Sequence, residues 1–145
     1  MSSTGAAENY RRIRDSLPQE VTVVVAVKGR TADEVAAVVE AGATVIGHNH
    51  VQAAERMRAE LGSAAVSVNW HLIGHLQRNK VNRALPLFDV IQTVDSLRLA
   101  QALNVRAQRP TAVYVEVNVG GEESKCGVPP EGLSPLLERI AALSS

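Results

Sequence analysis

The chain has 145 residues, a common size for one domain, and 15 Lys and Arg residues balance 15 Asp and Glu residues. This length can bury a core without disulfides, and zero net charge argues against a general affinity for nucleic acid or anionic membranes. Only 3% of the residues are aromatic, so single-stranded bases would find few stacking platforms. We expect a single domain over residues 1–145.

The cysteine content and the apolar runs predict where the protein resides. Cys126 is the only cysteine and has no internal disulfide partner, and residues 1–9 lack the apolar core of a signal peptide. The longest apolar run, residues 21–27, is far shorter than the roughly 18–20 residues of a membrane span. We therefore expect a cytoplasmic protein without a membrane segment.

Strand-like apolar runs alternate with helical stripes along the chain. An amphipathic stretch before Pro18 predicts an N-terminal helix, and the β-branched run that follows predicts a parallel strand covered on both faces. In chain order, the strand-then-helix pairs are strand 21–27 with a helix that Thr31 and Glu34 cap, strand 44–46 with helix 51–61, strand 66–72 with helix 77–85, strand 88–93 with a helix capped at 95 or 96, and strand 111–119 with helix 133–143.

Polar residues mark the ends of the predicted strands at a nearly constant spacing. They are Lys28, Asn49, His71, Thr93 and Asn118, separated by 21, 22, 22 and 25 positions. Five βα units at such a spacing favour a (β/α)₈ TIM barrel over an open doubly wound sheet. Eight units need roughly 200 residues or more, so the chain is either the first part of a barrel or an open five-stranded sheet.

Lys28 is the first candidate for chemistry. In parallel βα folds the carboxyl ends of the strands carry function, and Lys28 directly follows seven apolar or β-branched residues. We expect its side chain to emerge partly desolvated, which favours the neutral amine that attacks carbonyl groups. The alternative is a lysine that simply ends the strand and extends into solvent.

Other residue patterns carry weaker signals. If the second and third strands are neighbours, His48, His50, His71 and His75 share one rim that could hold zinc, but H-x-H and H-x₃-H spacings are common by chance and we expect no metal site. No phosphate-binding glycine motif follows a strand. Cys126 lacks the surroundings of an activated thiol, so we expect no catalytic nucleophile.

Several segments together resemble a known family. They are Ala26-Val-Lys28, Gly47-His-Asn-His-Val-Gln52, Trp70-His-Leu-Ile-Gly-His-Leu-Gln-Arg-Asn-Lys80, Thr93-Val-Asp95-Ser96, and Asn118 followed by Glu123-Ser-Lys-Cys-Gly127. This set is similar to the pyridoxal phosphate homeostasis proteins of the YggS/PROSC type, which are related to the N-terminal barrel of alanine racemases. The likeness extends over residues 21–143, and the tryptophan–histidine segment is its most specific part.

The resemblance implies a fold, a cofactor and a set of site residues. It implies a partial (β/α)₈ barrel of five βα units after an N-terminal helix, incomplete at its C-terminus. It also implies that pyridoxal 5′-phosphate is held as a Schiff base on Lys28, with Asn49 lining the pocket and with His71 and Asn118 as weaker candidates for the same wall. Members of the family act as carriers or regulators of the intracellular cofactor, so we expect a binding protein without catalytic residues.

The sequence departs from the family pattern in two ways. His48 and His50 stand where the family usually has an acid and an aromatic residue, so the local hydrogen bonding must differ. The last three βα units of the family, which supply the phosphate contacts, have no counterpart here, so we expect weak and rapidly exchanging binding. The open edges of a five-stranded arc would also invite pairing with another copy.

Two rival functions remain open at this stage. A racemase-like enzyme would use the same cofactor but needs a tyrosine or a second lysine opposite Lys28, and neither Tyr10 nor Tyr114 lies at a predicted strand end. The other rival is a shortened chain that has lost cofactor binding.

Overall fold

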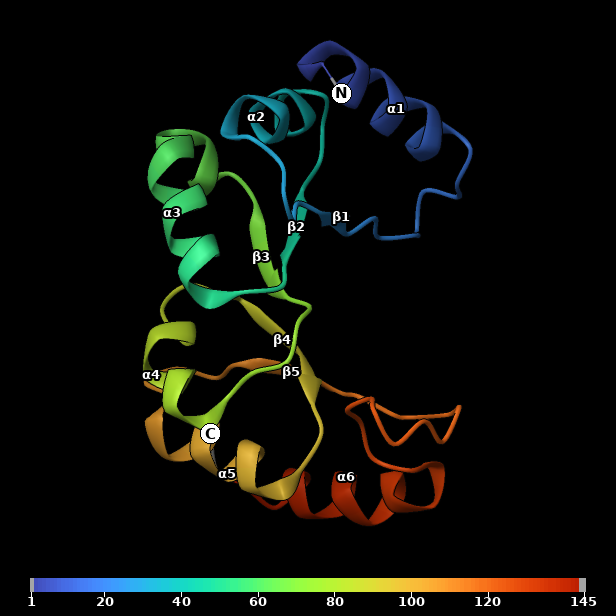
Figure 1. Ribbon diagram of the computed structural model, residues 1–145, viewed down its shortest axis with the longest axis vertical. Helices are drawn as coiled ribbons and strands as arrows, with labels where there is room; N and C mark the ends of the chain where they lie inside the picture. The colour runs from blue at the N-terminus through green and yellow to red at the C-terminus, as the bar shows by residue number, and fades with distance from the viewer. Residues whose placement is uncertain (1, 144–145) are drawn as a thin grey trace. The chain divides into compact units, whose positions relative to one another are not determined.

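The computed structural model describes residues 2–143, which divide into two compact units, one ending at His71 and one beginning at Leu72. Parallel strands alternate with helices (Figure 1). In the first unit β1 (Val25–Ala26) pairs with β2 (Val45–His48), and in the second β4 (Val90–Val94) pairs with β5 (Ala112–Val115). This arrangement confirms the predicted α/β class, with βα units that follow an N-terminal helix. None of the helices in the described part has the length and apolar character to cross a membrane.

The first unit holds the N-terminal helix and the first βα units. Its elements are α1 (Ser3–Asp15), β1 (Val25–Ala26), α2 (Ala32–Glu40), β2 (Val45–His48), α3 (Val51–Leu61), the 3₁₀ turn η1 (Gly62–Val66) and β3 (Asn69–Leu72), which ends where the second unit begins. The predicted capping box is confirmed, since the backbone N–H of Glu34 donates to Thr31 Oγ1 and the Glu34 carboxylate accepts from the backbone N–H of Thr31.

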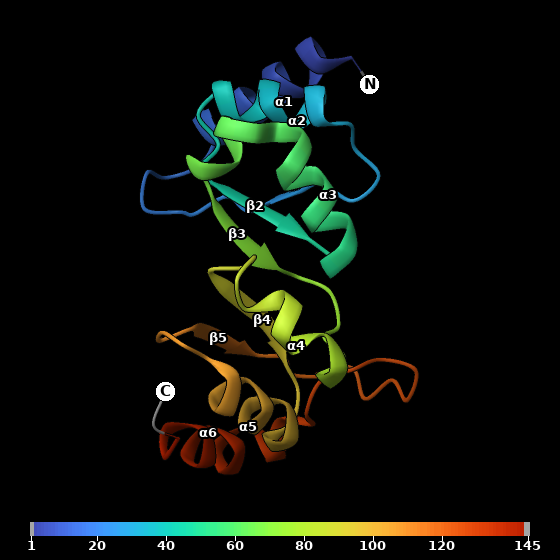
Figure 2. The same ribbon diagram turned by 90° about the vertical axis from the view of Figure 1, so that its left-hand side faces the viewer.

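Helices α1 and α2 pack against each other (Figure 2). Tyr10 on α1 is buried with Val38 and Ala43, and its hydroxyl donates to the carbonyl of Gly42 at 3.2 Å. Gly42 has a φ of +104°, a conformation that favours glycine, and it follows the end of α2. The predicted amphipathic helix therefore covers the end of α2 by both apolar contact and one directed hydrogen bond.

The predicted strand at residues 21–27 is wrong in its length and its coverage. Only Val25 and Ala26 pair as a strand, Val21 is 40% exposed, and the run is fully buried only at Val27. Within the described residues β1 has one partner strand, β2. No second strand offers hydrogen-bond partners along the other edge of β1, so the strand stays short. An apolar groove of about 440 Å³, lined from α1, β1 and α2, lies beside it.

The third predicted strand also begins too early. Residues 62–66 form η1, and Val66 is 84% exposed. Local hydrogen bonds hold this turn, because Ser67 Oγ donates to the carbonyl of Ala64 and Trp70 Nε1 donates to that of Ala65. The strand forms only from Asn69, whose N–H donates to Thr44 at 2.9 Å.

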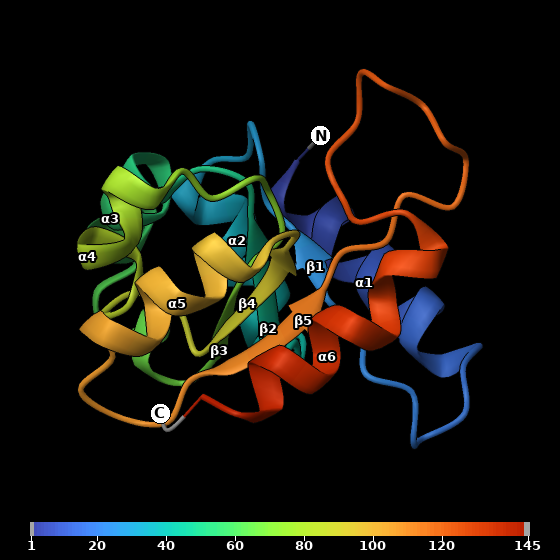
Figure 3. The same ribbon diagram turned by 90° about the horizontal axis from the view of Figure 1, so that it is seen from below.

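The second unit packs its helices around β4 and β5. Its elements are η2 (Arg78–Lys80), α4 (Val81–Ala84), β4 (Val90–Val94), α5 (Leu97–Arg106), β5 (Ala112–Val115), η3 (Pro130–Gly132) and α6 (Leu133–Ala141). Ser96 caps α5 through its hydroxyl, as the sequence predicts, and α5 lies beside α6 (Figure 3). The helix predicted at residues 77–85 is instead a 3₁₀ turn followed by one short α-helix.

The last predicted strand, 111–119, is also shorter in the structure. It ends at Val115, and Val117 then pairs with Val128 in an isolated parallel bridge. Gly127 makes this return possible, since its φ is +105° and a Cβ there would lie 2.8 Å from the backbone nitrogen of Asn118. Instead of continuing as a strand of the sheet, the chain after Val115 lies close to the backbone of its own returning loop.

Candidate functional site

Lys28 lies on a tight turn directly after β1. The N–H of Arg30 donates to the carbonyl of Val27 at 3.1 Å, and Gly29 has a φ of +74° that favours glycine at this turn position. The Lys28 side chain is exposed, so the expected partial desolvation is not seen, and its ammonium has no ion-pair partner among residues 2–143. The turn presents a primary amine that small molecules can reach.

Asn49 lies at the same edge of the sheet as Lys28. The parallel pairing of β1 with β2 places Val25 opposite Ile46 and Ala26 opposite Gly47, an offset of 21 residues. The same offset relates Lys28 to Asn49: Lys28 is two positions beyond the end of β1, and Asn49 directly follows β2. Both predicted site residues therefore lie at the carboxyl edge of these two strands, and Asn49 is half-buried. Their role toward a cofactor stays a prediction.

His48, the last residue of β2, is a structural residue that sequence reasoning left without a role. It is 4% exposed, and its Nδ1 accepts a hydrogen bond from the backbone N–H of His50 at 3.1 Å. Burial lowers the pKa of His48, and the positive charges of His50 and Arg56 lower it further. The ring is therefore neutral at neutral pH and carries its proton on Nε2.

The buried His48 makes stability depend on pH. Its folded pKa lies below 6.5, so the unfolded chain binds the proton more readily and the free energy of unfolding falls as pH drops below about 6.5. His48→Asn keeps an acceptor for the N–H of His50 and should flatten this dependence in urea denaturation between pH 5 and 8. His50→Gln should retain most of it, because burial is the larger cause. An unchanged slope in His48→Asn would contradict the assignment.

His71 lies within β3, beside β2, and is 7% exposed. The structure places it one residue before the end of β3, and the predicted strand 66–72 likewise extends to Leu72. The side chain therefore belongs to the buried part of the sheet. Its contribution to a pocket wall stays a prediction.

Asn118 belongs to the second unit, where it closes a loop. Its Nδ2 donates to the carbonyl of Glu122 at 2.9 Å, and its Oδ1 accepts from the N–H of the same residue at 3.3 Å. Both ends of the amide are therefore used in the 118–122 turn, a role that the sequence analysis missed. Asn118 with Gly120-Gly121 two positions later is the local signal that could have indicated such a turn. Its cofactor role stays a prediction.

The two tyrosines lie away from the strand ends. The Tyr10 hydroxyl is engaged with the Gly42 carbonyl, and Tyr114 is inside β5 with 56% of its surface exposed. The structure places neither residue at the end of a strand, where an acid or base for the cofactor would be expected.

The chain matches one protein family over nearly its whole length. Residues 3–145, which include both units, match the family model described as alanine racemase, N-terminal domain. The chain is 34% identical over 141 residues to the pyridoxal phosphate homeostasis protein of Bos taurus, covering 91% of this chain and 52% of the relative. It is 31% identical to the Escherichia coli K12 protein of the same name, covering 94% and 64%. The chain thus spans about half the length of the mammalian relative.

Solved structures show the same fold. PipY of Synechococcus elongatus with pyridoxal phosphate bound aligns at a TM-score of 0.86 with 31% identity, over 96% of this chain and 65% of PipY. Alanine racemase from E. faecalis aligns at 0.77 over 99% of this chain and 39% of its own length, and at 14% identity it shows the fold alone. These neighbours confirm that the five βα units correspond to part of a barrel.

Proposed function

The chain belongs to the alanine racemase N-terminal domain family, and from that premise we propose that it binds pyridoxal 5′-phosphate as a homeostasis protein, with Lys28 as the attachment residue. The names of the curated relatives and the PipY complex support this choice of ligand. The observation that carries the proposal is the exposed, unpaired amine of Lys28 at the carboxyl edge of β1.

The residues at this edge fit the aldehyde end of the cofactor. Pyridoxal phosphate supplies an aldehyde, which condenses with a lysine amine to a Schiff base with loss of water. The Lys28 amine is accessible, and the Gly29 turn fixes where the side chain leaves the backbone. Asn49 offers an amide at the same level of the sheet, which can donate to or accept from a bound ring substituent.

His48 shapes this edge without contributing charge. Its neutral ring accepts from the N–H of His50 and so fixes the chain on either side of Asn49. Burial lowers the pKa of His48, so its ring adds no positive charge to this edge at neutral pH. We propose that His48, through its hydrogen bond with His50, holds Asn49 in position.

We propose binding rather than racemisation as the function. Moving a Cα proton needs a second acid or base near the cofactor, and Tyr10 and Tyr114 are both away from the strand ends. We also propose a cytoplasmic location. The single, exposed cysteine of the chain supports it, because it has no internal disulfide partner.

Borohydride reduction tests the attachment directly, because the chain has only three lysines, at positions 28, 80 and 125. The protein is mixed with pyridoxal phosphate, reduced, digested and mapped by peptide mass spectrometry. We expect one label per chain on Lys28. Label spread over Lys80, Lys125 and the N-terminal amine, or no label, would contradict the proposal.

A further inference from the structure

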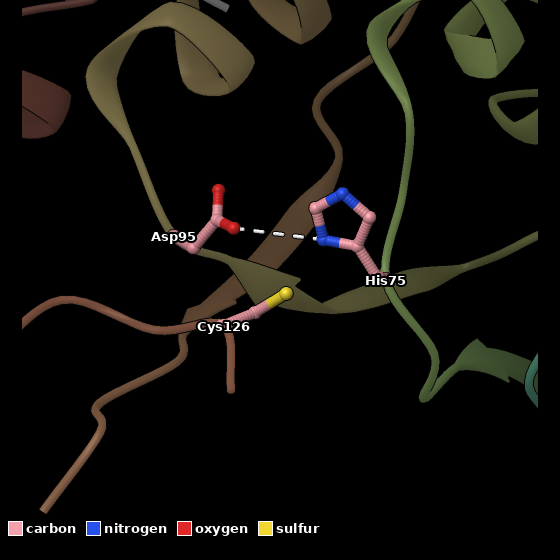
Figure 4. A group of neighbouring side chains, drawn as sticks. All are labelled: His75, Asp95 and Cys126. Atoms are coloured by element: carbon pink, nitrogen blue, oxygen red, sulfur yellow. Dashed lines mark ion pairs between the residues drawn. The ribbon is translucent and has the colours of Figure 1, made fainter. Parts of the chain in front are cut away.

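Three side chains of the second unit form a cluster that neither the family nor the cofactor accounts for. They are His75, Asp95 and Cys126, whose ligand atoms all lie within 4.8 Å of one another. Figure 4 shows the imidazole, the carboxylate and the thiol directed toward a common point, with Nδ1 of His75 3.5 Å from Oδ2 of Asp95. The donor atoms are one nitrogen, one oxygen and one sulfur.

The backbone holds each member of the cluster in place. Asp95 directly follows β4 and precedes Ser96, the N-cap of α5. His75 follows Gly74, whose carbonyl accepts from the buried Thr93 hydroxyl of β4 at 2.8 Å. Cys126 precedes Gly127, where the chain approaches Asn118 too closely for any side chain. The juxtaposition thus depends on strand β4 and on the bridge between residues 117 and 128.

A further carboxylate, that of Glu116, shares a cleft with two members of the cluster. Glu116 lines the same cleft of about 380 Å³ as His75 and Cys126, and its buried Oε2 has no hydrogen-bond partner within the part of the chain that the structure describes. Lys125 also lines this cleft, but its ammonium pairs with Glu122 at 2.7 Å. A buried carboxylate oxygen without a donor is costly, and a cation at the cluster would compensate it.

The surroundings of Cys126 do not favour nucleophilic chemistry. Partial desolvation raises the pKa of the Cys126 thiol, and the charges of Asp95 and Glu116 raise it further. The thiol is therefore poorly suited to act as a free nucleophile.

We propose that His75, Asp95 and Cys126 form a binding site for a zinc-type divalent transition-metal ion, with Glu116 as a nearby carboxylate that neutralises its charge. Nitrogen, thiolate and carboxylate donors together favour zinc or cobalt over magnesium or calcium. Tetrahedral coordination at ordinary bond lengths places ligand atoms about 3.3–3.8 Å apart, so the observed cluster needs only small side-chain rotations. The metal–sulfur bond forms as the thiol proton leaves to solvent, and water or Glu116 takes the fourth position.

Cobalt(II) is the probe that tests this site, and the test is independent of pyridoxal phosphate. The reduced protein is titrated with Co²⁺ in absorbance. Since Cys126 is the only cysteine, a sulfur-to-cobalt charge-transfer band can come only from this residue. We expect that band and intense tetrahedral d–d absorption to saturate at one equivalent, and one equivalent of Zn²⁺ to remove both.

Variants distinguish metal binding by all three side chains from binding by the Cys126 thiol alone. Cys126→Ser should eliminate the charge-transfer band, and His75→Gln and Asp95→Asn should each weaken cobalt binding at least about tenfold. His50→Gln and Asp89→Asn are the matched controls, because they remove an imidazole and a carboxylate elsewhere on the chain, and their titrations should equal that of the parent. Far-UV circular dichroism checks that each variant is folded.

Two results of the cobalt titration would overturn the proposal. One is the absence of the sulfur band at saturating Co²⁺. The other is a band whose affinity is unchanged in both His75→Gln and Asp95→Asn, which would indicate binding to the thiol alone. X-ray absorption of the zinc-loaded parent protein needs no variant, and it should show one sulfur among nitrogen and oxygen neighbours. A shell of nitrogen and oxygen only would also reject the site.

Discussion

Lys28→Ala is expected to abolish the lysine-linked absorbance of added pyridoxal phosphate and to leave the fold intact. The Lys28 side chain is exposed and has no ion pair within residues 2–143, so its removal should change the free energy of unfolding by less than about 0.5 kcal/mol. Lys28→Arg should lose the absorbance equally, because a guanidinium keeps the charge but offers no amine for the aldehyde. Absorbance titration and intact mass after reduction measure both effects.

Matched lysine variants distinguish this result from general loss of reactivity. Lys125→Ala and Lys80→Ala remove the other two side-chain amines of the chain, and they should retain the absorbance and the reduced adduct of the parent. If Lys28→Ala binds the cofactor as the parent does, the attachment residue is wrong. If Lys28→Arg binds without an adduct, the pocket survives and only the covalent link depends on Lys28.

Trp70→Ala is expected to destabilise the first unit by about 3–5 kcal/mol, the usual cost of truncating a buried tryptophan. Trp70 lies in β3 and is 0% exposed. Its Nε1 donates to the carbonyl of Ala65 at 3.0 Å, and the Arg58 guanidinium lies 5.3 Å from the ring centroid. Truncation therefore leaves a cavity and removes the donor for a carbonyl of η1.

Two further variants show how much of the lost stability comes from the Trp70 ring and how much from its hydrogen bond. Trp70→Phe keeps an aromatic ring and should recover most of the loss, with a remaining cost that includes about 1 kcal/mol for the missing hydrogen bond. Val66→Ala truncates a side chain that is 84% exposed and should be nearly neutral. Far-UV circular dichroism in urea is the measurement, because the substitution removes the only tryptophan. If the free energy of unfolding of Trp70→Ala falls by less than about 1 kcal/mol, Trp70 is not part of the cooperatively folded core.

The boundaries of α2, α3 and α5 were predictable because their signals are local. Thr31 with Glu34 predicts the start of α2, Gly62 predicts the end of α3, and Ser96 predicts the start of α5. Each signal consists of a side chain or a glycine that satisfies backbone groups within four residues. Such contacts depend on residues that are neighbours in the sequence and not on distant parts of the chain.

The strand lengths were not predictable in the same way. The runs 21–27, 66–72 and 111–119 all have strand-like patterns in the sequence, but only 25–26, 69–72 and 112–115 are strands. A strand extends only where a neighbour offers hydrogen-bond partners, and at 117–128 the chain pairs with its own returning loop instead. The residues of a run do not show where the neighbouring strand ends.

Sequence alone determined the order of the helices and strands and pointed to the family, and it predicts Lys28 as the residue for carbonyl chemistry. These depend on periodicity, local caps and contiguous motifs, and all three are properties of short segments. Only the tertiary structure decided that His75, Asp95 and Cys126 meet and that His48 is buried. These contacts join segments up to 51 positions apart or depend on burial, so no fixed spacing in the chain encodes them.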